Sequence, residues 1–374
     1  MTVFARTDTS ILGRWWWTVD RLTLLAVAGL IAFGGLLTLA ASPAVANRIG
    51  LDGLHLAHRQ LALLPVAAAL VVAVSLVSPR TVRRLAAIGF LVSLALTALT
   101  LAVGTEIKGA TRWLDIAGFS LQPSEFLKPT FAVVAAWMFA AARSGRGKFP
   151  GDAVATALYL LVVFLLVRQP DLGMAAVVTA VFFAQAFAAG LPIVWVAAAL
   201  AVMTGALIAA YFAFPHVANR VDGFLDPSSG DTYQIDRSLE AFRNGGLFGR
   251  GPGEGTVKGV LPDAHSDFVF AVAGEELGLI ACLLIIGLFA FVVLRGFSRL
   301  LQETNLFVVF AATGLLVQFG MQAIINMASS LRLMPTKGMT LPFLSYGGSS
   351  LLALALGIGM LLALTRRRVG YREA

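Results

Sequence analysis

The sequence predicts an all-α polytopic membrane protein with about ten transmembrane helices. Hydrophobic residues make up 58% of the 374-residue chain and charged residues only 13%. Apolar runs repeatedly reach the roughly 20 residues that a helix needs to cross the hydrocarbon core of a bilayer. The first run is too long for the apolar core of a signal peptide and many more follow, so no cleaved leader is expected.

Ten segments are expected to span the membrane, with boundaries that are soft by several residues. In chain order they are Leu22–Ser42, Leu61–Ser78, Leu85–Val103, Ser124–Ala142, Val154–Val167, Met174–Gly190, Ile193–Phe214, Asp267–Leu294, Leu306–Asn326 and Tyr346–Leu364. The predicted domains are a cytoplasmic N-terminal segment, a membrane domain with one large extracytoplasmic loop, and a cytoplasmic tail: residues 1–21, 22–364 (loop 215–266) and 365–374.

Short basic connectors set the predicted orientation. With the N-terminus in the cytoplasm, the basic stretches Pro79–Arg84, Arg143–Lys148, Arg295–Arg299 and Arg366–Arg368 all fall inside, as the positive-inside rule requires. An even number of spans places the C-terminus inside as well. Trp15–Trp17, just before the first span, is expected to be an interfacial anchor.

The net charge of +8 does not indicate nucleic acid. In a membrane protein such a charge first reflects basic cytoplasmic loops, and no nucleic-acid motif is present. Cys282, which lies in an apolar run, is the single cysteine of the chain. An intrachain disulfide and a cysteine-based metal site are therefore excluded.

Four polar segments are predicted to meet on the outer side: Gly104–Pro123, Arg168–Gly173, Pro215–Ser266 and Met327–Ser345. They carry many cations on the face where the orientation rule predicts few, namely Lys108, Arg112, Arg168, Arg220, Arg237, Arg243, Arg250, Lys258, Arg332 and Lys337. Long outer loops translocate regardless of charge, which is the plainer explanation for any one of them. Together they suggest an anionic ligand at the outer membrane surface.

The segment LPDAHSDFVFAVAGEELG carries ionisable groups into a predicted span, and such groups are costly at membrane depth and often functional. Asp267 stands at the junction, where a partly desolvated carboxylate can have a raised pKa and act as a general base. The alternative is that Asp267 caps the following helix. Glu275 and Glu276 lie deeper, where an ion pair with arginines from other spans is expected for at least one. His265 is equally consistent with a structural role.

Three further segments offer weaker signals. The run GRGPGEG, at Gly249–Gly255, is consistent with a phosphate-cradling loop or a plain turn-rich linker, since it lacks the ending of a P-loop. Arg112 beside Trp113 presents a cation and a flat apolar face, which suits a sugar or a lipid headgroup. The plainer interpretation is an interfacial Trp with a snorkelling Arg. RQPDLG, which holds Asp171, is typical of a tight turn, and Ile325–Ser350 could form an irregular wall of a site.

Five of these motifs, taken in order, closely resemble the SEDS family (shape, elongation, division and sporulation proteins). They are WLDIAGFSLQPSEFLK, RQPDLG, YQIDRSLEAFRNGGLFGRGPGEG, LPDAHSDFVFAVAGEELG and NMASSLRLMPTKGMTLPFLSYGGSS, and the resemblance covers nearly the whole chain from the first span onward. GLFGRGPGEG and KGMTLPFLSYGGSS look more like the division-specific FtsW branch than the elongation-specific RodA branch.

The resemblance implies a ten-span fold related to GT-C glycosyltransferases and a peptidoglycan glycosyltransferase activity on lipid II. Asp267 matches the catalytic aspartate of the family, while Asp263 and Ser266 replace its usual Glu and Thr and keep their chemical type. An α-linked donor and a β-1,4-linked product imply one inverting displacement with a single general base, Asp267. Outer cations such as Arg112, Arg243, Lys258 and Lys337 would stabilise the departing diphosphate.

The candidate site residues fall into two sets. Those expected at the substrate are Lys108, Arg112, Trp113, Arg243, Arg250, Lys258, His265, Arg332, Lys337 and Ser345. Those expected in structural or ion-pair roles are Glu125, Lys128, Asp171, Glu275 and Glu276. A divalent cation, Mg²⁺ or Mn²⁺, could assist the leaving diphosphate, but the sequence shows no dedicated ligand cluster.

The implied partners are lipid II, a single-span class B penicillin-binding protein that crosslinks the product, and other divisome membrane proteins. The implied location is the division septum of a bacterial cytoplasmic membrane. Three other interpretations stay open: a flippase for the lipid-linked precursor that uses Glu275, Glu276 and arginines as its pathway, a scaffold for a partner enzyme, and an elongation-type polymerase. Polar material concentrated on one side argues against the flippase.

Overall fold

Helices dominate the fold, which a computed structural model describes over residues 10–107, 110–116, 119–144, 149–213, 217–218, 221–222, 224, 232–335 and 338–367. Ten long helices within these residues match the ten predicted spans: α2 (Arg21–Arg48), α3 (His55–Ser75), α4 (Pro79–Val103), α5 (Pro123–Ala142), α6 (Gly151–Arg168), α7 (Leu172–Ala188), α8 (Ile193–Ala213), α11 (Val269–Leu300), α12 (Leu306–Ser330) and α13 (Gly348–Leu364). The shorter helices are α1 (Ile11–Thr18), α10 (Tyr233–Gly245) and the 3₁₀ helix η1 (Val257–Gly259).

Length and composition identify a multi-pass membrane protein. Among the described residues, seven helices are long and apolar enough to cross a membrane: α2 to α6, α11 and α12. At 17 residues each, α7 and α13 are also apolar and lie near the lower limit of length for a span. The predicted fold class is confirmed.

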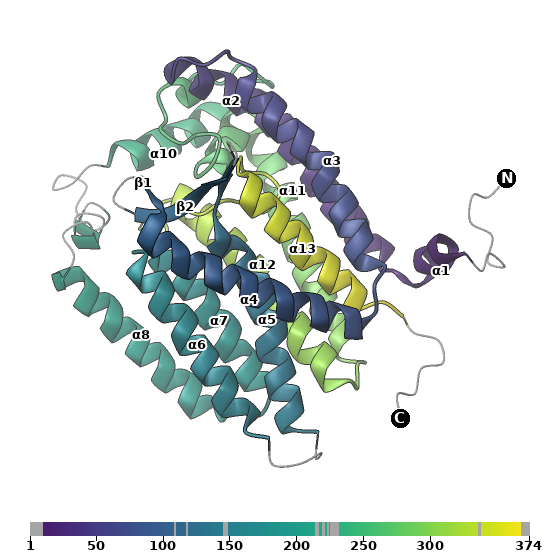
Figure 1. Ribbon diagram of the computed structural model, residues 1–374. Helices are drawn as coiled ribbons and strands as arrows, with labels where there is room; N and C mark the ends of the chain where they lie inside the picture. The colour runs from purple at the N-terminus through teal and green to yellow at the C-terminus, as the bar shows by residue number, and fades with distance from the viewer. Residues whose placement is uncertain are drawn as a thin grey trace.

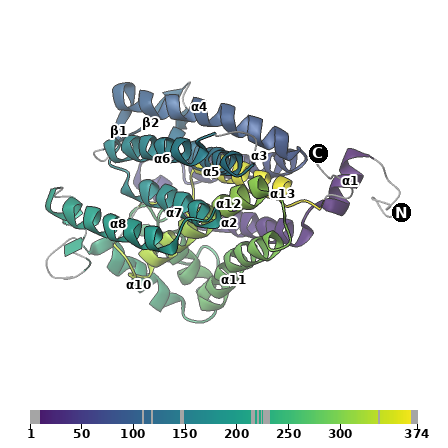
Figure 2. The ribbon, with the colours of Figure 1, turned by 90° about the horizontal axis from the view of Figure 1, so that it is seen from below.

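The core lies where α5, α12 and α13 pack together, and most residues of these helices are buried. Figures 1 and 2 show α12 and α13 between α4 on one side and α11 on the other. A side-chain amide joins three helices in this core. Nε2 of Gln185, on α7, donates hydrogen bonds to the carbonyls of Ala132 on α5 (2.6 Å) and Phe310 on α12 (3.0 Å).

One end of the bundle, which we call the basic end, joins segments that the sequence places together on the inner side. Asp20 is buried between Arg295 and Arg299, with closest N–O distances of 2.7 and 3.1 Å. Arg366 donates to the carbonyl of Leu76 (3.3 Å). Burial alone would raise the pKa of Asp20, but hydrogen bonds from Arg295 and a neighbouring threonine, with the Arg299 charge, hold that pKa below its ordinary value.

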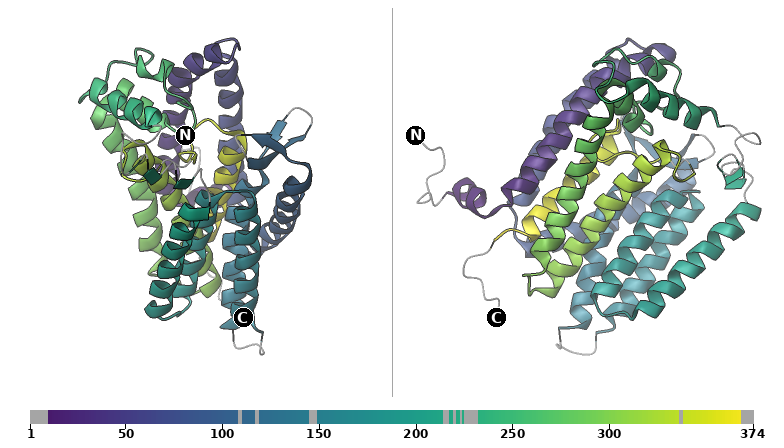
Figure 3. Two further views of the ribbon diagram at one scale, coloured as in Figure 1. Left: turned by 90° about the vertical axis from the view of Figure 1, so that its left-hand side faces the viewer. Right: turned by 180° about the vertical axis from the view of Figure 1, so that it is seen from behind.

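The opposite end, the pocket end, contains structure that hydropathy did not predict. Residues of the predicted loop Gly104–Pro123 form an antiparallel sheet in the order β1-β2-β3, with strands Thr105–Ile107, Ala110–Ile116 and Phe119–Leu121. Figure 3 shows these strands and the green α10 at the same end of the bundle. Strands of three to seven residues carry too little alternation to stand out in a sequence. Within the predicted loop 215–266, residues 232–266 form α10, η1 and turns.

Candidate active site

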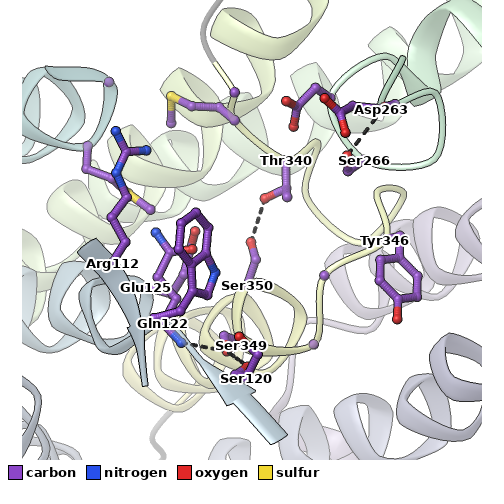
Figure 4. Close-up of a pocket in the computed structure, with 18 of the residues that line it drawn as sticks. Arg112, Ser120, Gln122, Glu125, Asp263, Ser266, Thr340, Tyr346, Ser349 and Ser350 are labelled. Carbon is purple, nitrogen blue, oxygen red and sulfur yellow. Dashed lines mark hydrogen bonds between the residues drawn. The ribbon is translucent and has the colours of Figure 1, made fainter. Parts of the chain in front are cut away.

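A pocket of about 1060 Å³ opens at the pocket end, and all four predicted outer segments contribute to its lining together with α3. Its polar and charged lining residues include Arg59, Arg112, Trp113, Gln122, Glu125, Asp171, Asp263, Asp267, Thr340 and Tyr346. Figure 4 shows Arg112, Gln122 and Glu125 on one side, with Asp263 and Ser266 across from them. The predicted meeting of these segments is confirmed.

A tight turn presents Asp267 to the pocket. Asp263 has a left-handed backbone (φ 53°), which aspartate tolerates better than most residues. Its carbonyl accepts hydrogen bonds from the backbone N–H groups of Ser266 (3.1 Å) and Asp267 (3.0 Å). The turn leaves Asp267 half-buried at the pocket wall.

The helix-cap interpretation of Asp267 is wrong. Helix α11 begins at Val269, and its cap residue is Phe268, with no side-chain cap hydrogen bond. The Asp267 carboxylate instead approaches the loop that carries Gly338, where an added Cβ would lie only 3.0 Å from Oδ2 of Asp267. A carboxylate placed against a loop backbone in a pocket can exchange a proton with a bound hydroxyl group.

The strand β2 brings Arg112 and Trp113 to the pocket. Arg112 donates to the carbonyls of Gln169 (3.1 Å) and Pro170 (2.6 Å) and lies 3.3 Å from the carboxylate of Asp171. Asp171 also accepts a hydrogen bond from the N–H of Met174 (3.2 Å) and so caps α7. The segment RQPDLG therefore binds strand β2 as well as forming a turn.

Glu125, in the pocket lining, forms a buried ion pair with Lys128, with 2.8 Å between Nζ and Oε2. Lys128 also donates to Oε1 of Gln322 on α12 (3.0 Å), and Nε2 of Gln322 donates to the carbonyl of Thr340 (3.1 Å). The hydroxyl groups of Thr340 and Ser350 are 2.6 Å apart. These contacts link α5, α12, α13 and the segment that carries Thr340 at the pocket floor.

Glu275 and Glu276 bind the preceding loop rather than arginines from other spans. Lys258 lies 2.5 Å from Oε1 of Glu276, and Glu275 accepts hydrogen bonds from the N–H groups of Thr256 (2.9 Å) and Val257 (3.1 Å). Both glutamates are fully buried. We call this arrangement, together with Arg250 (3.9 Å from Glu275), the acidic latch.

The acidic latch changes the interpretation of GRGPGEG. The N–H of Gly253 donates to Oε2 of Glu276 (2.9 Å), so the anion that this loop cradles belongs to the protein itself. Gly249 and Gly278 approach so closely that a Cβ on Gly278 would lie 2.3 Å from the nitrogen of Gly249. Gly278 has φ 80° and breaks α11 at this point. Arg250 and Lys258 therefore lie outside the pocket lining, against the expectation that they bind diphosphate.

The structure places four other candidates outside the pocket lining. Arg243 is exposed on α10. Arg332 donates to the carbonyl of Phe224 (3.4 Å). His265 packs on Tyr346, with 5.0 Å between ring centroids. Ser345 is buried, and its hydroxyl donates to the carbonyl of Ser266 (2.5 Å). His265 and Ser345 therefore support the wall without lining it. Lys108 and Lys337 lie outside the described residues.

Sequence reasoning missed Arg59 and Gln60, on α3. Arg59 lines the pocket. Gln60 is buried, donates to the carbonyl of Ser345 (3.2 Å) and accepts from the N–H of Gly347 (3.3 Å). Both residues immediately precede the predicted span at Leu61. Two polar residues at the start of an apolar helix are the signal that could have identified them.

No group of three or more His, Cys, Asp or Glu side chains that could hold a metal ion occurs among the residues that the structure describes. The expectation that Mg²⁺ or Mn²⁺ assists the leaving diphosphate stays a prediction.

The fold and the pocket together define a multi-pass membrane protein with a carboxylate-bearing site at one end of its helices. The family model for FtsW, RodA and SpoVE, described as cell cycle proteins, matches residues 20–369. The chain belongs to this family, and the predicted SEDS membership is confirmed.

Relatives and solved structures agree with this assignment. The chain is 49% identical over 368 residues to the "Probable peptidoglycan glycosyltransferase FtsW" of Caulobacter vibrioides, covering 98% of this chain and 94% of that protein. It is 33% identical to the protein of the same name from Escherichia coli O157:H7, covering 92% and 85%. The resemblance to the FtsW branch is thus confirmed.

Two solved chains share the fold. One belongs to a peptidoglycan synthase complex that coordinates polymerization and crosslinking, with a TM-score of 0.75, 29% identity and coverage of 94% of this chain and 98% of that chain. The other is the rod shape determining protein RodA of Thermus thermophilus, with a TM-score of 0.68, 29% identity and coverage of 94% and 97%.

Proposed function

We propose that this protein is a peptidoglycan glycosyltransferase that polymerises lipid II into β-1,4 glycan strands at the outer face of the bacterial cytoplasmic membrane. The observation that carries the proposal is the placement of the Asp267 carboxylate in a pocket that four polar segments and α3 enclose. The names of the relatives support the same activity.

The proposed reaction is one inverting displacement. The acceptor 4-hydroxyl attacks the anomeric carbon of the donor and transfers its proton to Asp267, while the bond from that carbon to the lipid diphosphate breaks. The new C–O bond forms on the opposite face of the sugar, so the α-linked donor yields a β-linked product. Trp113, in the pocket lining, would offer its face to a sugar ring.

Two arginines suit the departing diphosphate. Arg59 and Arg112 are the cations that line the pocket within the described part of the chain. Hydrogen bonds from Arg112 to two carbonyls hold its guanidinium in place. A preorganised cation stabilises developing charge more than a mobile one does. Lys337, outside the described residues, is retained as a sequence-based candidate.

The proposed setting is the division septum, with both termini in the cytoplasm. The basic end gathers the segments that the positive-inside rule assigns to the cytoplasm. The pocket end would then face outward, where lipid II carries its sugars. The likeness to a chain of a peptidoglycan synthase complex supports a class B penicillin-binding protein as partner, beside other divisome membrane proteins.

Purified protein in vesicles, with and without such a partner, tests the proposal against a flippase. Labelled lipid II supplied on the pocket side should be converted to glycan strands that migrate as a ladder on a gel. The same vesicles should not move labelled lipid II to the other leaflet, as measured by its accessibility to an impermeant reagent. Movement without strand formation, in the presence of the partner, would overturn the proposal.

A further inference from the structure

One side-chain amide connects two walls of the pocket. Asn326, on α12, is buried, and its Nδ2 donates hydrogen bonds to the carbonyl of Asp267 (2.9 Å) and to the carbonyl of Met339 (2.6 Å). The first carbonyl belongs to the turn that presents the proposed base. The second belongs to the loop that follows Gly338.

The bridge lies beside a close contact between the two walls. Met339 is the neighbour of Gly338, whose added Cβ would be 3.0 Å from Oδ2 of Asp267. A shift of either backbone segment would therefore move the carboxylate relative to the loop. One helical turn earlier, Gln322 holds the same loop through Thr340 (3.1 Å). Gln322 and Asn326 on α12 therefore both hold the loop. Of these two residues, only Asn326 also joins the loop to Asp267.

We infer that Asn326 is a positioning residue that sets the place of the Asp267 carboxylate in the pocket, an inference that rests on the proposed function. The role requires two N–H donors on one side chain. An ionised aspartate has none and serine has one. A misplacement of about 1 Å can cost on the order of 10²-fold in rate, so the loss of this bridge should be visible in turnover.

The chain contains a matched control for the structural cost of the substitution. Gln185 is also buried, and its amide also donates to two backbone carbonyls, at 2.6 and 3.0 Å. Its partners, Ala132 and Phe310, lie outside the pocket lining. Asn326→Ala and Gln185→Ala therefore each leave two backbone carbonyls without a side-chain donor, and only the first changes the surroundings of Asp267.

The experiment measures thermal stability and steady-state polymerisation of labelled lipid II for the purified protein with its partner. The Tm of both variants should fall below that of wild type by a similar number of degrees. Asn326→Ala should lower kcat at least about tenfold with KM within about twofold, as loss of transition-state positioning predicts, while Gln185→Ala should stay within about twofold of wild type. Asn326→Ser keeps one donor, so its kcat should lie between those of Asn326→Ala and wild type. This variant replaces Asn326→Ala in the comparison if Asn326→Ala does not fold.

A double-mutant cycle separates positioning from general damage. In the Asp267→Asn background, Asn326→Ala should cause no further loss, because the group that it positions is gone. Equal kcat for Asn326→Ala and Gln185→Ala, or an undiminished further loss in that background, would overturn the inference. Retention of wild-type rate by Asp267→Asn alone would instead contradict the proposed role of Asp267 as general base, whereas absence of polymerisation by the wild-type protein with its partner would contradict the proposed function.

Discussion

Asp267→Asn is expected to lower the rate of glycan polymerisation by at least about 10²-fold, the usual cost of a missing general base. Asparagine matches aspartate in size but does not accept a proton at neutral pH. The backbone contacts of Asp267, to Asp263 and Asn326, do not involve its carboxylate and should persist. The measurements are the initial rate of labelled lipid II incorporation and the Tm, which should stay close to that of wild type.

Asp263→Asn is the matched control for this prediction. Asp263 lines the same pocket, and asparagine also tolerates its left-handed backbone, so the variant removes an equal charge with little strain. Its rate should fall much less than that of Asp267→Asn. Equal losses for the two variants would indicate that the pocket needs negative charge rather than a base at Asp267.

Lys258→Ala is expected to destabilise the fold by about 3–5 kcal/mol, because it leaves the buried carboxylate of Glu276 without its ion-pair partner. The acidic latch joins the segment before η1 to the kink of α11 at Gly278. Loss of this contact should therefore lower the Tm of the protein. Thermal unfolding of purified protein in detergent measures the effect.

Arg243→Ala controls for the loss of a cation from the same region. Arg243 is exposed on α10, and its removal should change stability by no more than about 0.5 kcal/mol. If Lys258→Ala instead keeps the wild-type Tm and loses activity on lipid II in a manner that depends on ionic strength, the destabilisation account is wrong. That result would support the substrate role that the sequence suggested for Lys258.

Hydropathy predicted the membrane helices well because burial in lipid demands long apolar segments, and each of the ten predicted runs corresponds to a helix. The asymmetry of arginine and lysine also grouped Arg295 with the N-terminal segment and Arg366 with the end of α3, as the contacts of Asp20 and Leu76 show. The sheet of β1, β2 and β3 escaped prediction because its strands are short and its pairing is local to one loop.

The site was predictable only in part. Asp267, Arg112 and Trp113 stood out as polar or aromatic residues beside spans, and all three line the pocket. The charges of Lys258 and Arg250 were equally conspicuous, but their partners come from 18 and 25 residues farther along the chain, at Glu276 and Glu275. A sequence shows that a cation is present and does not show which anion folding brings to it.

The location of the bound sugar tests the central claim most directly. Lipid II that carries a photoreactive group on its disaccharide should crosslink to β2 near Trp113 and to the segment 338–350, in competition with unlabelled lipid II. Peptide mapping by mass spectrometry identifies the labelled residues. Crosslinks confined to the apolar groove that Tyr159, Phe182 and Trp195 line between α6, α7 and α8 would contradict the assignment of the pocket as the site of glycosyl transfer.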